Sequence, residues 1–254
     1  MSPASGPDGS PGQGEGGRGA SPSRDYWDRR AEEDPYWYVA KQATGDEAFF
    51  GQGGAEVDAY LAHCDLRPSS RHTVVEIGCG VGRMTRRLSE VFGRVVAVDV
   101  SPRMVAMARE QLADRPNVTW VVGSGRDLDA VPDASVEAVF SYITLQHVPE
   151  AATLRRYLVE AQRVLAPGGR AALQVRRPGW RAAAIDNAGH LWFRLAGRPT
   201  TAPEWRGTRL GAAELLATRR GPGFHLELRP RTLRHSWLVV TRDPGPAVEA
   251  GMGD

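Results

Sequence analysis

The stretch VVEIGCGVGRMT, residues 74–85, decides how this chain should fold. An apolar run meets an acid, and three glycines follow at alternate positions, Gly78, Gly80 and Gly82. Glycine destabilises strands and helices alike, so this cluster indicates a loop with an unusual backbone. Such a loop between a strand and a helix lets the backbone approach a ligand closely, and the helix N-terminus offers free N–H groups. The alternative interpretation is a tight turn that binds nothing.

Strand and helix patterns alternate around this loop. Apolar runs predict strands at 73–78, 94–100, 117–123, 136–143 and 170–176, and periodic patterns predict helices at 46–62, 82–92, 101–113 and 150–165. Ser101 and Pro102 are suited to the first turn of their helix. Two further runs, 224–229 and 235–242, predict an antiparallel hairpin. We therefore expect an α/β fold with a doubly wound, mostly parallel seven-stranded sheet that ends in a C-terminal antiparallel hairpin.

Composition predicts one folded domain between two polar ends. Residues 1–23 are rich in Gly, Pro and Ser and cannot bury enough apolar surface to fold, so we expect a disordered head. A single domain should cover 24–242, and 243–254 should form a flexible tail. Inside the domain, the aromatic-rich segment 24–65 predicts a helical lid, and 178–207, which lacks a clear strand, predicts a cap.

The charge balance excludes some partners. The 254 residues carry 32 basic and 30 acidic side chains, a net charge of +2, which is not typical of a protein that binds nucleic acid or a membrane surface. No apolar run approaches the ~20 residues needed to cross a bilayer. There are two cysteines, Cys64 and Cys79, and no apolar signal core, so we expect a cytoplasmic protein.

The second predicted strand restricts the chemical class of the ligand. It ends at Asp99, where an acid can accept hydrogen bonds from a ribose diol or simply cap the strand end. The glycines follow G-x-G-x-G rather than the dinucleotide pattern G-x-G-x-x-G, and Glu76 would repel a phosphate nearby. Together these features favour a nucleoside with a cationic or zwitterionic attachment.

Four more segments follow the loop in order: VVAVDVSPRMVAMAR, VVGSGRDL, VFSYITLQHVPE and RVLAPGGRAALQV. With the glycine loop they resemble the class I S-adenosylmethionine-dependent methyltransferase family, and within it the small-molecule branch. The resemblance covers residues 73–177 and, more loosely, the chain to 242. It implies a Rossmann-like fold that binds S-adenosylmethionine and releases S-adenosylhomocysteine. No carboxylate cluster of metal-binding spacing follows the fourth strand, so we expect no metal.

The resemblance also implies cofactor-binding positions. Glu76 would lie by the methionyl amine, Arg83 by the methionyl carboxylate and Asp99 by the ribose hydroxyls. Ser124 stands where the family often has an acid, and a hydroxyl accepts a hydrogen bond more weakly than a carboxylate. The remaining predicted cofactor-binding residues are Gly78, Cys79, Gly80, Val100, Met104, Gly125, Arg126 and Ser141. Cys79 also admits interpretation as a nucleophile, because a helix N-terminus lowers the pKa of a thiol.

His147 is the candidate base. It follows the fourth strand, where open parallel sheets form their active crevice, and imidazole titrates near neutral pH. The competing interpretation is a histidine that fixes the loop. Residues expected to bind the methyl acceptor, or else to pack on the sheet, are Tyr26, Trp27, Tyr38, Tyr142 and Trp180.

These features predict an enzyme that methylates an oxygen or nitrogen of a small molecule. Alignment of the acceptor with the cofactor would supply most of the rate, with assistance from His147. The alternatives are a non-catalytic cofactor-binding protein of the same fold, a protein or RNA methyltransferase and, less favoured by the glycine spacing, an NAD(P)-dependent oxidoreductase. The sequence does not choose an oligomeric state.

Overall fold

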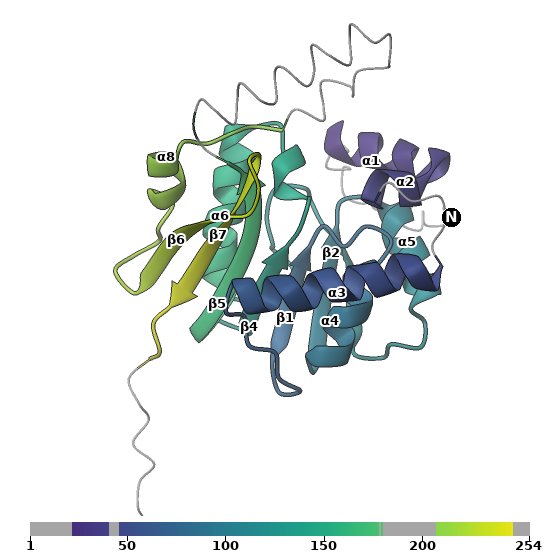
Figure 1. Cartoon of the computed structure of the whole chain (residues 1–254), viewed down its shortest axis with the longest axis horizontal. Helices are drawn as coiled ribbons and strands as arrows, with labels where there is room; N and C mark the ends of the chain where they lie inside the picture. The colour runs from purple at the N-terminus through teal and green to yellow at the C-terminus, as the bar shows by residue number, and fades with distance from the viewer. Residues whose placement is uncertain (1–21, 41–45, 178, 180–206, 246–254) are drawn as a thin grey trace, which may run out of the picture.

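Seven strands form one mixed sheet in the order β3-β2-β1-β4-β5-β7-β6 (Figure 1). The computed structural model describes residues 22–40, 46–177, 179 and 207–245. The five strands β1 to β5 run parallel, and β7 pairs antiparallel with β5 and β6. The strands are β1 (Thr73–Ile77), β2 (Arg94–Asp99), β3 (Val118–Val122), β4 (Val136–Ser141), β5 (Leu165–Arg176), β6 (Phe224–Pro230) and β7 (His235–Arg242). The predicted α/β fold with a C-terminal antiparallel hairpin is confirmed.

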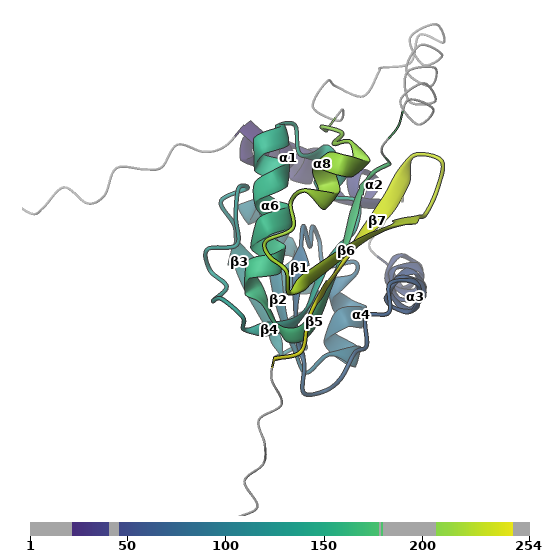
Figure 2. The ribbon, with the colours of Figure 1, turned by 90° about the vertical axis from the view of Figure 1, so that its left-hand side faces the viewer.

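Helices cover both faces of the sheet (Figure 2). On one face lie α3 (Glu47–His63), α4 (Thr85–Val91) and α5 (Pro102–Gln111); on the other lie α6 (Ala151–Val164) and α8 (Ala212–Leu216). The strands carry nearly continuous apolar runs because both of their faces are buried, as in β1, where Val74 and Val75 are fully inaccessible. A separate apolar core thus lies on each side of the sheet.

Two element boundaries differ from the sequence prediction. Helix α4 begins at Thr85 rather than at Gly82, because Gly82 adopts φ +87°, which no right-handed helix contains. The fifth strand begins at Leu165, directly after α6, so Pro167, Gly168 and Gly169 lie within it. The pairing of β5 with β4 shifts register at this point, which accommodates these residues in the strand.

Two short helices, α1 (Pro22–Glu33) and α2 (Pro35–Ala40), pack near α5 at one end of the sheet (Figure 1). Arg24 on α1 donates to the carbonyl oxygens of Val100 and Gly123, each at 3.2 Å, and Asp28 on α1 accepts from the Ser101 hydroxyl. Helix α1 is therefore attached to the loops that follow β2 and β3.

The folded part extends slightly beyond its predicted limits. Ser23 already belongs to α1, although the sequence assigned it to a disordered head. Asp243 accepts from Gly168 through its backbone and pairs with His225, so the structured chain continues past 242. Residues 1–21, 246–254 and nearly all of the predicted cap 178–207 lie outside the described residues. Within the described ranges, no helix is long and apolar enough to cross a membrane.

Candidate active site

The glycine loop joins β1 to α4 and forms the floor of the site. Gly78, Gly80 and Gly82 all have positive φ, +82°, +52° and +87°, a region that side chains disfavour. A Cβ on Gly78 would also lie 2.0 Å from the Thr144 Oγ1 atom. The backbone N–H groups of Gly78 and Cys79 donate to the Val98 carbonyl at 2.7 and 3.1 Å, which ties the loop to β2. Gly78 is therefore required both for the turn and for the approach of the loop after β4.

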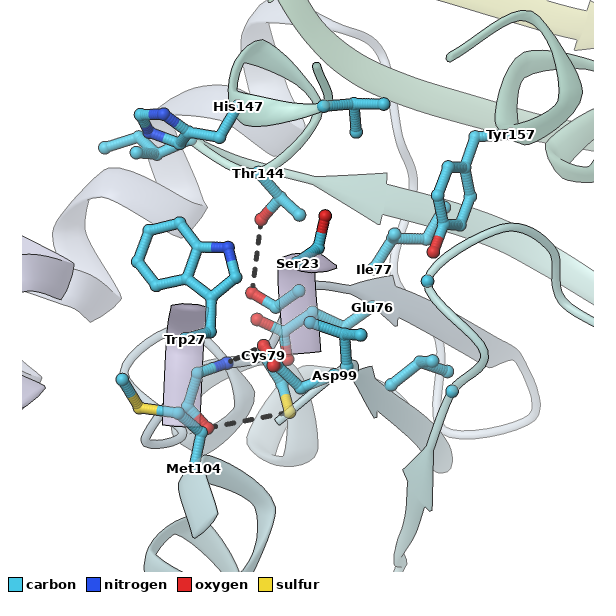
Figure 3. Close-up of a pocket in the computed structure, with 18 of the residues that line it drawn as sticks. Ser23, Trp27, Glu76, Ile77, Cys79, Asp99, Met104, Thr144, His147 and Tyr157 are labelled. Atoms are coloured by element: carbon cyan, nitrogen blue, oxygen red, sulfur yellow. Dashed lines mark hydrogen bonds between the residues drawn. The ribbon is translucent and has the colours of Figure 1, made fainter. Parts of the chain in front are cut away.

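Two carboxylates, the buried Glu76 and the half-buried Asp99, flank this loop. Glu76, 3% exposed, accepts from the Thr85 hydroxyl at 2.6 Å. Asp99, at the end of β2, accepts from the Gly80 N–H at 2.9 Å and from the Ser101 N–H at 2.9 Å. Figure 3 shows both acids beside the glycine loop. The backbone and side-chain donors hold each carboxylate in place while leaving further oxygen lone pairs available.

Burial makes these carboxylates unusually basic. It raises the pKa of Glu76 from 4.5 to about 7, against the hydrogen bond from Thr85 and with a small contribution from Asp99. The pKa of Asp99 is also raised by burial, although backbone hydrogen bonds oppose the shift. Among the described residues, neither carboxylate has an arginine, lysine or histidine within ion-pair distance. A cationic or hydroxyl-bearing ligand bound here would therefore be stabilised strongly by these two carboxylates.

Most predicted cofactor-binding residues line one cavity with these acids. Val100 and Met104 line it beyond Asp99, and Arg83 lines it from the α4 side. Arg83 is almost completely buried and ion-paired with Glu56 at 2.9 Å, so its charge is already shared. The cavity is also lined by Gly78, Cys79, Gly80, Gly125 and Arg126. Cys79 is buried, and burial raises the pKa of its thiol well above the usual range, which argues against a nucleophile.

Three predicted site residues do not line the cavity. The Ser124 hydroxyl donates to Asp127 at 2.6 Å, and Ser141 is fully buried and donates to the Ile77 carbonyl at 3.0 Å. Tyr26, only 6% exposed, packs its ring edge-on against Trp27 at 5.2 Å. Ser124, Ser141 and Tyr26 therefore stay predicted cofactor or acceptor residues that do not line this cavity, and Trp180 lies outside the described residues.

The other end of the cavity is aromatic. His147, on the 3₁₀ turn η1 (Leu145–His147), packs edge-on against Trp27 of α1 with ring centroids 5.7 Å apart. The Nε2 atom of His147 lies 3.0 Å from the Gln146 amide nitrogen. Figure 3 shows His147 and Trp27 together on one side of the cavity. Tyr38 and Tyr142 also line the cavity, so four of the six residues predicted to handle the acceptor converge there.

Several lining residues were not predicted. Ile143 adopts φ +57°, rare for a β-branched side chain, and its N–H donates to the Gln174 side chain at 2.7 Å. Thr144 donates to the Gly78 carbonyl at 3.3 Å and thereby joins the two loops. Tyr157 reaches the cavity from α6 (Figure 3). Nothing in the sequence around Tyr157 marked it as a site residue, and nothing in the sequence SYIT marks a left-handed Ile143.

The described residues contain no cluster of three or more side chains that could hold a metal ion. The site consists of two acids, Glu76 and Asp99, beside a glycine loop, together with aromatic rings and a histidine that line the same cavity. Such an arrangement can bind a polar nucleoside through the acids and enclose a second molecule against the rings.

Comparisons with known proteins agree with this geometry. The family model described as "Methyltransferase domain" matches residues 75–173. Demethylmenaquinone methyltransferase of Tropheryma whipplei (strain Twist) is 36% identical over 97 residues, 38% of this chain and 38% of the relative. Trans-aconitate 2-methyltransferase of Azoarcus sp. (strain BH72) is 42% identical over 108 residues, 41% and 39% of the two chains. The aligned segment thus spans about two fifths of these relatives.

A solved structure shares the fold. Magnesium protoporphyrin IX methyltransferase from Synechocystis PCC 6803, with bound S-adenosylhomocysteine, superposes with a TM-score of 0.58. The superposition covers 87% of this chain and 98% of the other at 19% identity. The segment that the family model matches begins within β1 and ends within β5, and so contains the glycine loop, Glu76, Asp99 and the loop after β4. Residues 75–173 therefore match a methyltransferase domain, and the chain is similar in fold to the S-adenosylmethionine-dependent class I methyltransferases.

Proposed function

We propose that the protein transfers the methyl group of S-adenosylmethionine to an oxygen or nitrogen atom of a small molecule. The observation that carries this proposal is a pair of carboxylates, the buried Glu76 and the half-buried Asp99, beside a glycine loop and without a cationic partner within ion-pair distance among the described residues. An ammonium group would satisfy Glu76, and a ribose diol would satisfy Asp99. A pyrophosphate would instead meet two like charges, which disfavours a nicotinamide cofactor.

The chain's own residues would hold the two reactants. S-adenosylmethionine supplies an activated methyl group on a sulfonium, whose C–S electron pair stays with sulfur as the methyl leaves. The acceptor atom supplies the electron pair of the new bond. Trp27, Tyr38 and Tyr142 would enclose the acceptor and exclude water, and alignment of this kind contributes up to roughly 7–11 kcal/mol. His147, which lines the same cavity, would accept the proton that an acceptor O–H or N–H loses.

The family relatives support a small acceptor. The names of those reported above refer to demethylmenaquinone, trans-aconitate and magnesium protoporphyrin IX, three unlike small molecules. Unlike acceptors in the names of proteins that share this domain or fold agree with a reaction that depends mainly on positioning. Both cysteines are buried and form no disulfide, which agrees with a reducing compartment. We therefore propose that the protein acts in the cytoplasm.

Calorimetric titration with S-adenosylhomocysteine tests the proposal. We expect the wild type to bind, and Asp99→Asn, which keeps the shape but removes the charge, to bind at least about 10-fold more weakly. Asp129→Asn is the matched control, because Asp129 is exposed and does not line the cavity. No binding by a folded wild type, or equal binding by Asp99→Asn, would overturn the cofactor assignment.

A further inference from the structure

A polar cluster lies behind Tyr142 at the acceptor end of the cavity. It joins Tyr60 from α3, Tyr142 from the loop after β4 and Arg231 from the turn between β6 and β7. An Arg231 Nη2 atom donates to the Tyr142 hydroxyl at 2.8 Å and to the Tyr60 hydroxyl. The guanidinium carbon lies 4.9 Å from the centroid of the Tyr60 ring and 5.1 Å from that of Tyr142. Three segments distant in sequence thus meet at one cation.

No carboxylate among the described residues lies within ion-pair distance of Arg231. Its side chain is half-buried, and its buried Nε has no hydrogen-bond partner there. Arg229, two residues earlier, is paired with both Asp65 at 2.8 Å and Glu227 at 2.9 Å. A partly desolvated guanidinium held only by two phenols favours a nearby anion, because its desolvation is only partly compensated.

The hydrogen bonds leave one proton available. The Tyr142 oxygen accepts from Arg231 and also from the Tyr60 hydroxyl at 3.2 Å. A phenol that accepts two hydrogen bonds still has its own O–H to donate. Donors to its oxygen make that O–H a stronger hydrogen-bond donor. Burial raises the pKa of Tyr142, so the group remains a phenol at neutral pH. Of the three side chains, Tyr142 is the one that lines the cavity.

The position of Tyr142 points away from the nucleoside. Asp99 ends β2, on the far side of β1, whereas Tyr142 follows β4 together with His147. On the side of the glycine loop, Arg83 lines the cavity and remains the residue predicted to bind the methionyl carboxylate. An oxygen bound at Tyr142 would therefore belong to the acceptor.

We propose that Tyr142 donates its hydroxyl hydrogen to a carboxylate or comparable oxyanion of the methyl acceptor. Tyr60 and Arg231 are positioning residues that orient and polarise this hydroxyl. The inference rests on the proposed methyltransferase function and narrows its substrate class to anionic small molecules. The proposal therefore predicts that the protein saturated with S-adenosylhomocysteine binds anionic ligands more tightly than neutral ones.

Paired fragments test this preference. Aryl carboxylates and their matched primary amides are titrated by ligand-observed NMR into protein saturated with S-adenosylhomocysteine. The wild type should favour the carboxylate set by about 5-fold or more. Tyr142→Phe, which keeps the ring, and Arg231→Gln should lose the preference, and Arg231→Lys should retain part of it. A purely structural role for Arg231 would weaken both members of each pair equally.

Two controls keep the outcomes separate. Arg229→Gln removes a cation from the same hairpin and should leave the preference unchanged. Equal binding of carboxylates and amides by the wild type would overturn this inference and leave the methyltransferase proposal standing, provided that S-adenosylhomocysteine still binds. Loss of S-adenosylhomocysteine affinity in folded Tyr142→Phe would also overturn it, because the cluster would then serve the cofactor.

Discussion

Glu76 shows how a single residue can serve binding at the expense of stability. Its pKa is raised from 4.5 to about 7, so the unfolded chain releases this proton at lower pH than the folded one. The stability that the protonated form contributes is complete below pH 4.5 and is lost as the pH rises through about 7. Above that pH the ligand-free protein keeps a buried, unpaired charge.

We therefore expect Glu76→Gln to stabilise the ligand-free protein at pH 8 by on the order of 2–3 kcal/mol and to have little effect at pH 4.5. The same change should weaken S-adenosylhomocysteine binding about 10-fold or more, because a charged hydrogen bond is lost. Urea unfolding at several pH values, with calorimetry at pH 8, checks both effects. A variant less stable than wild type at pH 8 would contradict the assignment of an unpaired charge.

Alanine substitutions at Gly78 and Gly168 would distinguish backbone strain from steric overlap. Their φ angles are similar, +82° and +78°, but a Cβ on Gly78 would meet Thr144, whereas a Cβ on Gly168 would meet nothing within 4 Å. We expect Gly168→Ala to cost about 1–2 kcal/mol and to leave ligand binding unchanged. Gly78→Ala should cost more and impair S-adenosylhomocysteine binding, as measured by urea unfolding and calorimetry. Equal losses in both variants would refute a separate role for the contact with Thr144.

At the scale of elements, polar contacts join α1 to the start of α5 in addition to the apolar contact of Ala31. Asp28 accepts from the Ser101 hydroxyl and the Arg103 N–H, and Arg103 pairs with Glu32 at 2.6 Å. Because Trp27 on α1 lines the cavity, the attachment of this helix should govern how fast a ligand leaves.

Asp28→Ala should therefore increase hydrogen exchange in α1 and raise the dissociation rate of S-adenosylhomocysteine by about 3–10-fold, with exchange in β1 and β4 unchanged. Hydrogen-exchange mass spectrometry and stopped-flow displacement measure the two effects. Asp25→Ala is the control, because the exposed Asp25 makes no contact with the sheet among those described. An unchanged dissociation rate despite faster exchange in α1 would show that this helix does not retain the ligand.

The elements were largely predictable because their signals are local. The apolar runs of β1 and β2 and the Ser101 cap each follow from a few neighbouring residues, and the Ser101 hydroxyl does accept from the Met104 N–H at 3.1 Å. The start of α4 was misplaced because the left-handed Gly82 was counted as its first residue. The start of β5 was misplaced because Pro167 and the two glycines after it usually end regular structure, and only pairing with β4 keeps them in the strand.

The site was predictable only where it lies next to a strand end. Glu76 and Asp99 belong to β1 and β2, so their convergence follows from a parallel sheet. Arg231 could not be predicted as a partner of Tyr142, because their contact depends on where the hairpin packs against α3. Ser141 and Tyr26 are next in sequence to residues that line the cavity, but their own side chains are buried in the interior. The sequence position of a residue does not show which way its side chain points.

At the scale of the whole molecule, one continuous sheet contains both the strands that carry the cofactor-binding residues and the hairpin of β6 and β7. S-adenosylhomocysteine at about 100 times its Kd should stabilise the protein by about 2.7 kcal/mol. For a domain of this size, the melting temperature should rise by roughly 5–10 °C. Differential scanning calorimetry checks the rise, and Asp99→Asn at the same ligand concentration should show a clearly smaller one.

Hydrogen exchange should resolve where this stabilisation acts. Added protection should concentrate in 73–101, which contains the glycine loop and both acids, and should be small in β6 and β7. Protection that is instead largest in the hairpin would place the nucleoside at the wrong end of the sheet.

The strand order also has a consequence for synthesis. β7 lies between β5 and β6 although it comes last in sequence, so the outer edge of β5 stays unpaired until His235–Arg242 has emerged from the ribosome. About 60 residues separate the end of β5 from β7, which corresponds to roughly 3–12 s of translation. During that interval the nascent chain presents a long apolar strand edge, the kind of surface that recruits other strands and aggregates. Of the described strands, β7 is thus the one that covers this edge and protects the newly made chain from self-association.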